Sequence, residues 1–227
     1  MVHYDEIVCY GGAGHAMVML HAGEYHWKGK VKLRAVVDDR HNGMIHPQLG
    51  VPVISAEDRL ESYADVPVFM GVGSPSACAR IGARLRGEGA TFASVPGRPE
   101  LVHPTVKLGE GVIVAPHTRI GPNVRIGDFC QLLGDLIAHD VTVGDACHLG
   151  VHSSVLGNVT IGAQTNIAPH AVICNGAPGA PLTIGSGATV AVGAVVSRDL
   201  PDGSKVIGNP AMPVEDWAKL KALIADQ

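Results

Sequence analysis

One pair of neighbouring residues, His139-Asp140, is suited to acid–base chemistry. An imidazole titrates near neutral pH, so a histidine can take a proton from an attacking amine or hydroxyl group. An adjacent carboxylate can fix the orientation of the ring and raise its basicity. His139 is therefore a candidate general base with Asp140 to orient it, and a histidine hydrogen-bonded only for structure is the alternative.

Regular intervals connect His139 to other candidate residues. Gly157 follows His139 by 18 positions, and Asn175 follows Gly157 by another 18. A backbone N–H at Gly157 could stabilise the oxyanion that forms when a nucleophile attacks an acyl group. His152 and His170 are also 18 positions apart, a pair that could belong to a zinc site.

The elements that must position these residues follow a six-residue repeat. Small branched residues recur with this period from Leu108 to Val190, with two intervals of eleven. A short fixed period indicates a solenoid. The in-phase positions are Leu108, Val114, Ile120 and Ile126, then Ile137, Val143, Leu149, Val155, Ile161, Ile167 and Ile173, then Ile184 and Val190. We predict a triangular parallel β-helix with about 18 residues per coil.

The geometry of the coil predicts where residues at these intervals lie relative to one another. Residues one coil apart stack at the same corner, so His139, Gly157 and Asn175 are expected to form one column. The second interval of eleven contains five surplus residues in a loop, Asn175–Pro181, and Arg198 is the next member of the column once they are allowed for. His148 lies half a coil from His139, so only a second copy of the chain can bring the two histidines together.

The first 99 residues follow a different pattern. Apolar strands are expected at Glu6–Tyr10, Val31–Val37 and Val66–Met70, with helices from His15 and over Ser76–Leu85. Strands alternating with helices predict a small parallel, Rossmann-like α/β sheet. We divide the chain into this α/β domain (1–99), the β-helix (100–212) and a short helical tail (213–227), in which Trp217, Leu220 and Ile224 have helical spacing.

Turns after the strands supply candidate nucleotide contacts. The glycine turn after the first strand offers free N–H groups to phosphates, although Met17 replaces the third glycine of a dinucleotide fingerprint. An aspartate after the second strand can accept ribose hydroxyls, and the turn after the third can contact base or ribose. The predicted nucleotide-sugar-binding residues are Gly12, Gly14, His15, Asp38, Asp39, Gly73 and Ser74.

Composition limits the classes of function. Hydrophobic residues make up 46% of the chain and charged residues 17%, which indicates a folded protein. A net charge of −4 gives no basis for binding nucleic acid, and no apolar run is long enough to span a membrane. Five cysteines without a CxxC pair and an N-terminus without a signal-peptide pattern lead us to expect a reducing cytoplasm.

The motifs, in their order, resemble the hexapeptide-repeat sugar acetyltransferases that carry an N-terminal nucleotide-binding domain. These include the bacillosamine- and perosamine-type nucleotide-sugar N-acetyltransferases and the sialic acid O-acetyltransferases. The resemblance covers nearly the whole chain. It rests on Tyr10-Gly11-Gly12-Ala13-Gly14-His15, Val37-Asp38-Asp39, Val102-His103-Pro104, Ala138-His139-Asp140, Leu156-Gly157-Asn158 and Gly208-Asn209-Pro210-Ala211.

This resemblance implies a left-handed β-helix, a homotrimer with active sites between subunits, and direct acetyl transfer from acetyl-CoA to an amino group of a nucleotide-linked sugar. It favours catalysis by His139 over the structural alternative, and it implies that His148 orients the acetyl group or the acceptor. The residues expected to bind acetyl-CoA are Asn175, Gly193, Ala194 and Arg198. No metal is expected. The family often carries an arginine five residues after Gly73, where this chain has Cys78, so the identity of the nucleotide base stays open.

Three alternatives remain at the level of sequence. The acceptor could be a hydroxyl of a sialic-acid-like sugar. The solenoid could be a zinc hydratase that uses histidines such as His152 and His170, or it could have no catalytic function. The sequence also leaves the sugar undetermined, and the nucleotide could be UDP, GDP or dTDP.

Overall fold

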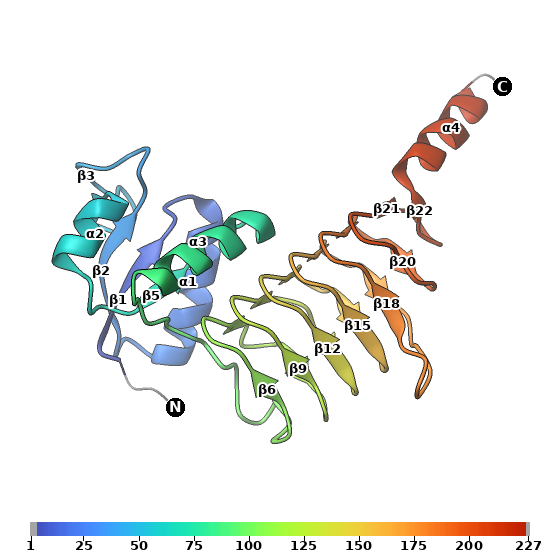
Figure 1. Cartoon of the computed structure of the whole chain (residues 1–227), viewed down its shortest axis with the longest axis horizontal. Helices are drawn as coiled ribbons and strands as arrows, with labels where there is room; N and C mark the ends of the chain where they lie inside the picture. Colours follow the sequence, from blue (N-terminus) through green and yellow to red (C-terminus); the bar gives the residue numbers. More distant parts are fainter. Residues whose placement is uncertain (1–3, 226–227) are drawn as a thin grey trace.

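The computed structural model describes residues 4–225. An α/β sheet with three helices lies at one end, a coil of short parallel strands extends from it, and a last helix projects from the far end of the coil (Figure 1). The predicted tail extends to residue 227, so its last two residues lie outside the described range, as do the first three of the chain.

The N-terminal sheet has five strands in the order β3-β4-β2-β1-β5. All its pairs are parallel except β3 with β4. Its strands are β1 (Glu6–Tyr10), β2 (Lys32–Val37), β3 (Met44–Ile45), β4 (Pro52–Ile54) and β5 (Val68–Met70). The three predicted strands are present within two residues of their expected ends. The sequence reading missed β3 and β4, which are only two and three residues long.

Three helices accompany these strands: α1 (Gly14–Trp27) follows β1, α2 (Ala56–Ser62) follows β4, and α3 (Pro75–Gly87) follows β5. The predicted helices correspond to α1 and α3, while α2 was not predicted. Ser55 and Asp58 form a capping box at the start of α2. Ser74 caps α3 by accepting from the Ala77 amide, and Pro75 occupies the first turn, where it removes no helical hydrogen bond.

The coil has three flat faces. The first face contains seven strands, the second five and the third five. On the first face lie β7 (Ile113–Val114), β10 (Gln131–Leu132), β13 (His148–Leu149), β16 (Asn166–Ile167), β19 (Thr189–Val190), β21 (Lys205–Ile207) and β22 (Met212–Pro213).

The second face contains β8 (Arg119–Ile120), β11 (Leu136–Ile137), β14 (Ser154–Val155), β17 (Val172–Ile173) and β20 (Val195–Val196). The third face contains β6 (Lys107–Leu108), β9 (Arg125–Ile126), β12 (Val141–Val143), β15 (Val159–Ile161) and β18 (Leu182–Ile184). Except for the pair of β21 with β22, which is antiparallel, neighbouring strands on each face are parallel.

The predicted repeat positions fill the interior. The core cluster of the coil runs from Val112 to Val206 and contains the in-phase branched residues except Leu108, which is half-buried and packs against it. One detail differs from the prediction. Leu132 also points inward, and it lies inside the first interval of eleven, between Ile126 and Ile137. This interval is therefore one full repeat of six residues followed by a repeat of five. The second interval contains the predicted loop between β17 and β18.

The N-terminal sheet packs against the first face. Phe129, at a corner of the coil, packs edge-on against Phe92 at 4.7 Å between ring centroids and belongs to the core cluster of the N-terminal sheet. Val95 forms a parallel bridge with Ile113, which extends the first face toward the N-terminal segment. This packing places the glycine turn before α1 next to the first face of the coil.

The last helix, α4 (Val214–Ala225), lies within the predicted helical tail and begins one residue after its expected start. Its side chains from Val214 to Leu223 are exposed, including Trp217 and Leu220. Within residues 4–225, no helix is long and apolar enough to cross a membrane.

Candidate active site

His139 and Asp140 lie at the corner where the chain turns from the second face to the third, called the His139 corner here. The Nδ1 of His139 donates to Oδ2 of Asp140 at 2.8 Å, and both side chains are about half exposed. This contact leaves Nε2 as the ring atom that can take a proton. The pair therefore has the geometry of a general base with an orienting carboxylate.

The second oxygen of Asp140 is also held. Asn123, which precedes it at the same corner, donates from Nδ2 to Oδ1 of Asp140 at 3.1 Å. The hydrogen bond from His139, followed by that from Asn123, lowers the pKa of Asp140, so the carboxylate stays ionised. Asp140 has a left-handed backbone, with φ of 55°, a conformation that aspartate tolerates better than most residues.

The predicted column of residues is present. The carbonyl of His139 accepts from the Asn158 amide, and a Cβ on Gly157 would lie 2.5 Å from Nε2 of His139. Only a glycine therefore lets the His139 ring lie against the next coil. This contact with the His139 ring is a direct structural reason for a glycine at position 157.

The Gly157 amide is already engaged in this structure. It donates to Oδ1 of Asn175 at 2.8 Å, so the predicted oxyanion donor is covered by the next residue of its own column. With its oxygen used in this way, the carboxamide of Asn175 has its two N–H groups left to donate.

The four residues expected to bind acetyl-CoA divide between two corners. Asn175 is at the His139 corner, and Arg198 continues that column because the register pairs Ile173 with Val196. Gly193 and Ala194 lie between β19 and β20, at the corner from the first face to the second. Within one chain the structure does not bring the two pairs together.

His148 lies on the first face rather than at a corner. It is 7% exposed and its Nε2, with no hydrogen-bond partner in the described residues, is buried. Burial lowers its pKa to about 4, and the nearby His15 adds to this shift while a hydrogen bond to the Gly73 backbone opposes it. His148 is therefore a neutral imidazole at physiological pH.

The ring of His148 stacks on that of His15, with centroids 5.3 Å apart and planes inclined by 9°. Both rings line a pocket of 250 Å³ between the N-terminal sheet and the coil, called the His148 pocket here. Gly73 also lines it, and a Cβ there would lie 3.0 Å from the His15 ring. The structure thus joins two predicted nucleotide-sugar residues to His148.

The remaining nucleotide-sugar candidates lie at the carboxyl ends of β1, β2 and β5, the edge where open parallel sheets bind ligands. A Cβ on Gly12 would be 3.6 Å from Oδ2 of Asp38, so the glycine turn and this aspartate are neighbours. Asp39 instead accepts from the Ala56 amide at 2.7 Å, and Ser74 accepts from the Ala77 amide. Asp38 also accepts from the Arg40 amide at 3.0 Å and contacts His41. Its position beside Gly12 still makes it better placed than Asp39 to meet a ligand at the glycine turn.

The two halves of the candidate site are on opposite sides of the coil. In a triangular prism, the corner between the second and third faces is opposite the first face. His139 is at that corner, and His148 is on the first face. A single chain cannot place both histidines on one acetyl group.

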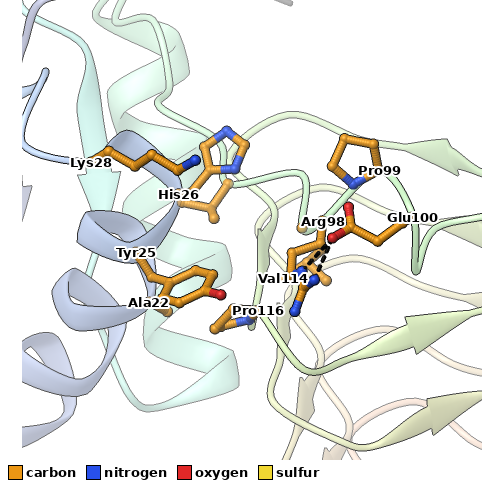
Figure 2. A pocket seen from close by; sticks show the side chains of 11 residues that line it. Ala22, Tyr25, His26, Lys28, Arg98, Pro99, Glu100, Val114 and Pro116 are labelled. Atoms are coloured by element: carbon orange, nitrogen blue, oxygen red, sulfur yellow. Dashed lines mark hydrogen bonds and ion pairs between the residues drawn. The ribbon is translucent and has the colours of Figure 1, made fainter.

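A second pocket, of 320 Å³, lies where the end of α1 meets the start of the coil (Figure 2). Tyr25, His26 and Lys28 face Arg98 there, and Arg98 is paired with Glu100. None of the predicted site residues lines this pocket.

His152 and His170, the two histidines considered as zinc ligands, are stacked as their spacing predicts. Their ring centroids are 5.0 Å apart. His152 donates from Nδ1 to the carboxylate of Asp135 at 3.1 Å. No group of three or more histidine, cysteine, aspartate or glutamate side chains within residues 4–225 is arranged to hold a metal ion.

Sequence reasoning missed two polar residues beside the predicted ones. Gln131 is 1% exposed and contacts His15. His46, also buried, donates from Nε2 to the Gly12 carbonyl at 2.9 Å. A glutamine on a face of the coil, beside the inward Leu132, is the one signal that could have singled out Gln131.

Solved structures resemble the chain over nearly its whole length. A GDP-perosamine N-acetyltransferase variant from Caulobacter crescentus, in complex with CoA and GDP-perosamine, is 31% identical with a TM-score of 0.79, covering 92% of this chain and 96% of that one. No family model matches the chain.

Curated relatives match over shorter stretches. GDP-perosamine N-acetyltransferase from Escherichia coli O157:H7 is 37% identical over 112 residues, which is 49% of this chain and 51% of that protein. The bifunctional protein GlmU from a Jannaschia species is 29% identical over 148 residues, 51% of this chain and 31% of that protein. The chain thus spans about half or less of the length of these curated relatives.

Proposed function

Because the chain belongs to the hexapeptide-repeat acyltransferases, we propose that it transfers the acetyl group of acetyl-CoA to the amino group of a nucleotide-linked amino sugar. The observation that carries the proposal is the His139–Asp140 pair, with Nδ1 bound to the carboxylate at 2.8 Å and Nε2 left to act as a base. The whole-chain likeness to a GDP-perosamine N-acetyltransferase indicates the acceptor.

In the proposed reaction the sugar amine attacks the thioester carbonyl, and Nε2 of His139 accepts the proton that the nitrogen loses. Asp140 remains ionised and stabilises the imidazolium that forms. The imidazolium then gives this proton to the departing sulfur, so that CoA leaves as a thiol and His139 returns to its neutral form. No covalent acetyl-enzyme is needed, and burial raises the pKa of the Cys9 and Cys78 thiols to about 12, which makes both poor nucleophiles.

The oxyanion of the attacked carbonyl needs hydrogen-bond donors beside His139. We assign this role to the Gly157 amide together with the carboxamide of Asn175. The Gly157 amide becomes free if the Asn175 side chain turns, and the N–H groups of that side chain can then donate to the same oxygen. Arg198 would meet the phosphates of CoA farther along the column.

The acceptor is proposed to bind with its diphosphate at the glycine turn of Gly12 and Gly14. Asp38 would accept ribose hydroxyls, with Asp39, Gly73 and Ser74 at the rim, and the sugar would reach the His148 pocket beside His15. GDP is the first nucleotide to test, because the similar solved structure contains GDP-perosamine.

The assembly proposed is a homotrimer whose coils pack side by side. In it, the His139 corner of one subunit faces His148, Gly193 and Ala194 of the next, which completes both halves of the site. The proposal also includes a left-handed coil and a Rossmann-like N-terminal domain. The domain boundaries are proposed near residues 99 and 212. A cytoplasmic location is supported by five cysteines that are all free.

The test is a direct assay with acetyl-CoA and three acceptors: GDP-perosamine, GDP linked to a sugar without an amine, and free GDP. We expect thiol release and an acetylated product with the amino sugar alone. Acetylation of the hydroxyl-only sugar would favour the O-acetyl alternative, and no transfer to any acceptor would contradict the proposal. Thermal shifts with UDP, GDP and dTDP would identify the nucleotide, since a ligand at 100 times its Kd stabilises by about 2.7 kcal/mol.

A further inference from the structure

Gln131 connects the coil to the N-terminal sheet through a buried carboxamide. Its Nε2 donates to the carbonyls of Met70, at 2.9 Å, and Val72, at 3.1 Å. Its Oε1 contacts Nε2 of His15. The side chain is 1% exposed, so water cannot substitute for these partners and each must be matched in donor and acceptor character.

This arrangement fixes which nitrogen of His15 carries the proton. Backbone carbonyls only accept hydrogen bonds, so the amide nitrogen of Gln131 must face Met70 and Val72. The amide oxygen, which can only accept, therefore faces His15. Nε2 of His15 must donate to it, and in the neutral ring Nδ1 is then the acceptor.

The neighbouring ring adds a second observation that points to a ligand. His148 stacks on His15 and is neutral, and its buried Nε2 has no partner in residues 4–225. Unsatisfied polar atoms at such burial are rare in folded proteins and call for a partner. Both rings line the same 250 Å³ pocket.

We infer that Gln131 is a positioning residue that holds His15 in the Nε2–H form, so that Nδ1 of His15 accepts a hydrogen bond from the substrate in the His148 pocket. The inference rests on the proposed function and extends it to the chemistry of the acceptor. The ligand group that fits Nδ1 is a donor, namely a hydroxyl or amine of the sugar. A carbonyl or phosphate oxygen would meet a lone pair there instead.

The first test reads the tautomer itself, by NMR of the histidine nitrogens in the full-length protein at mildly alkaline pH, with the His15 signal assigned from a His15→Ala variant. We expect wild-type His15 in the Nε2–H form and Gln131→Met with a mixture of both tautomers. Wild-type His15 in the Nδ1–H form, or an unchanged tautomer in Gln131→Met, would overturn the inference. The wild-type measurement decides even if the variant does not fold.

The second test separates positioning from stability. Gln131→Met should raise KM for the nucleotide sugar about tenfold, the effect of one lost hydrogen bond, and leave KM for acetyl-CoA unchanged. Thr165→Val is the matched control, because it removes one buried side-chain bond to a carbonyl elsewhere in the coil. If Thr165→Val raised KM for the nucleotide sugar as much as Gln131→Met does, Gln131 would have only a structural role. The same would follow if Gln131→Met raised the KM values of both substrates equally.

A wrong role for Gln131 can be distinguished from a wrong proposed function. If the protein shows no acetyl transfer, the tautomer of His15 still decides whether Gln131 acts as inferred. If transfer occurs while His15 has the other tautomer, the function stands and the role of Gln131 is wrong.

Discussion

An asparagine at position 139 could keep a hydrogen bond to Asp140 but could not accept a proton. We therefore expect His139→Asn to lower kcat by about 10²–10⁴, the usual contribution of a general base. Nucleotide-sugar affinity should stay close to wild type, because the proposed nucleotide contacts lie on the N-terminal sheet. Asp140→Asn is the companion variant and should cost less, since the imidazole remains. A His139→Asn enzyme within threefold of wild-type kcat would remove His139 from the mechanism.

Gly157 gives a test of the position of the His139 ring that leaves its chemistry intact. A methyl group on Gly157 would overlap Nε2 of His139, so Gly157→Ala should push the ring aside and lower kcat by about 10²-fold. Gly87→Ala is a control, because nothing lies within 4 Å of the added carbon there. Steady-state kinetics of both variants settle the point, and wild-type kcat in Gly157→Ala would show that the ring does not need this contact.

His148 makes the stability of the protein depend on pH. Its pKa falls from 6.5 in the unfolded chain to about 4 in the fold, so the unfolded state binds more protons between these values. The stabilisation is complete above the unfolded value and is lost as the pH falls toward 4. From pH 7 to pH 5, wild type should lose about 2 kcal/mol more than His148→Gln. Urea unfolding at both pH values measures this, and equal losses would mean that His148 is not held neutral.

At the scale of elements, the loop Asn175–Pro181 interrupts the coil without controlling its register. The Gly176 amide donates to the Gly157 carbonyl and the Leu182 amide to the Asn158 carbonyl, both at 3.0 Å, so the coil closes on either side of the loop. Inside it, Ala177 and Ala180 exchange two backbone hydrogen bonds. The loop is exposed and begins at Asn175, beside Gly157 and His139.

Deleting residues 177–181 should therefore spare the fold and affect binding. We expect a higher KM for acetyl-CoA or the acceptor, because the loop would form one wall of the proposed site beside His139. The melting temperature should stay near that of wild type. Steady-state kinetics with each substrate varied in turn give the answer. If both KM values match those of wild type, the loop is a surface elaboration without a role in binding.

The repeat in the sequence predicted the coil because each inward residue, such as Ile137 or Ile173, is buried by its nearest neighbours in the stack. Periodicity could not predict β3 and β4, which are too short to show a pattern. It also missed the contact of Gln131 with Met70, 61 positions apart. That contact depends on how the N-terminal sheet packs against the coil, which the periodicity of the sequence does not encode.

The same division holds for the candidate site. Spacing alone placed His139, Gly157 and Asn175 in one column, because the coil repeats every 18 residues there. It could not show that the Asn175 side chain already holds the Gly157 amide, or that His148 is buried against His15. These facts depend on side-chain orientation and on the packing of the N-terminal sheet.

At the scale of the whole molecule, the proposed site needs a second copy of the chain. His139 lies at one corner of the prism and His148 on the opposite face. In the proposed trimer, the His139 corner of each subunit would face His148 of the next, which would form three equivalent sites. The central claim is that acetyl transfer takes place at these shared sites.

The most direct measurement is the activity of hybrids made from two inactive variants, His139→Ala and His148→Ala, unfolded together in equal amounts and refolded. In a trimer with shared sites, about a quarter of the interfaces join an intact His139 to an intact His148. The account predicts that acetyl transfer to the nucleotide sugar returns in proportion, while each variant refolded alone stays inactive. Hybrids as inactive as the parent variants, with trimers formed, would show that no site joins His139 of one subunit to His148 of another, and would contradict the account.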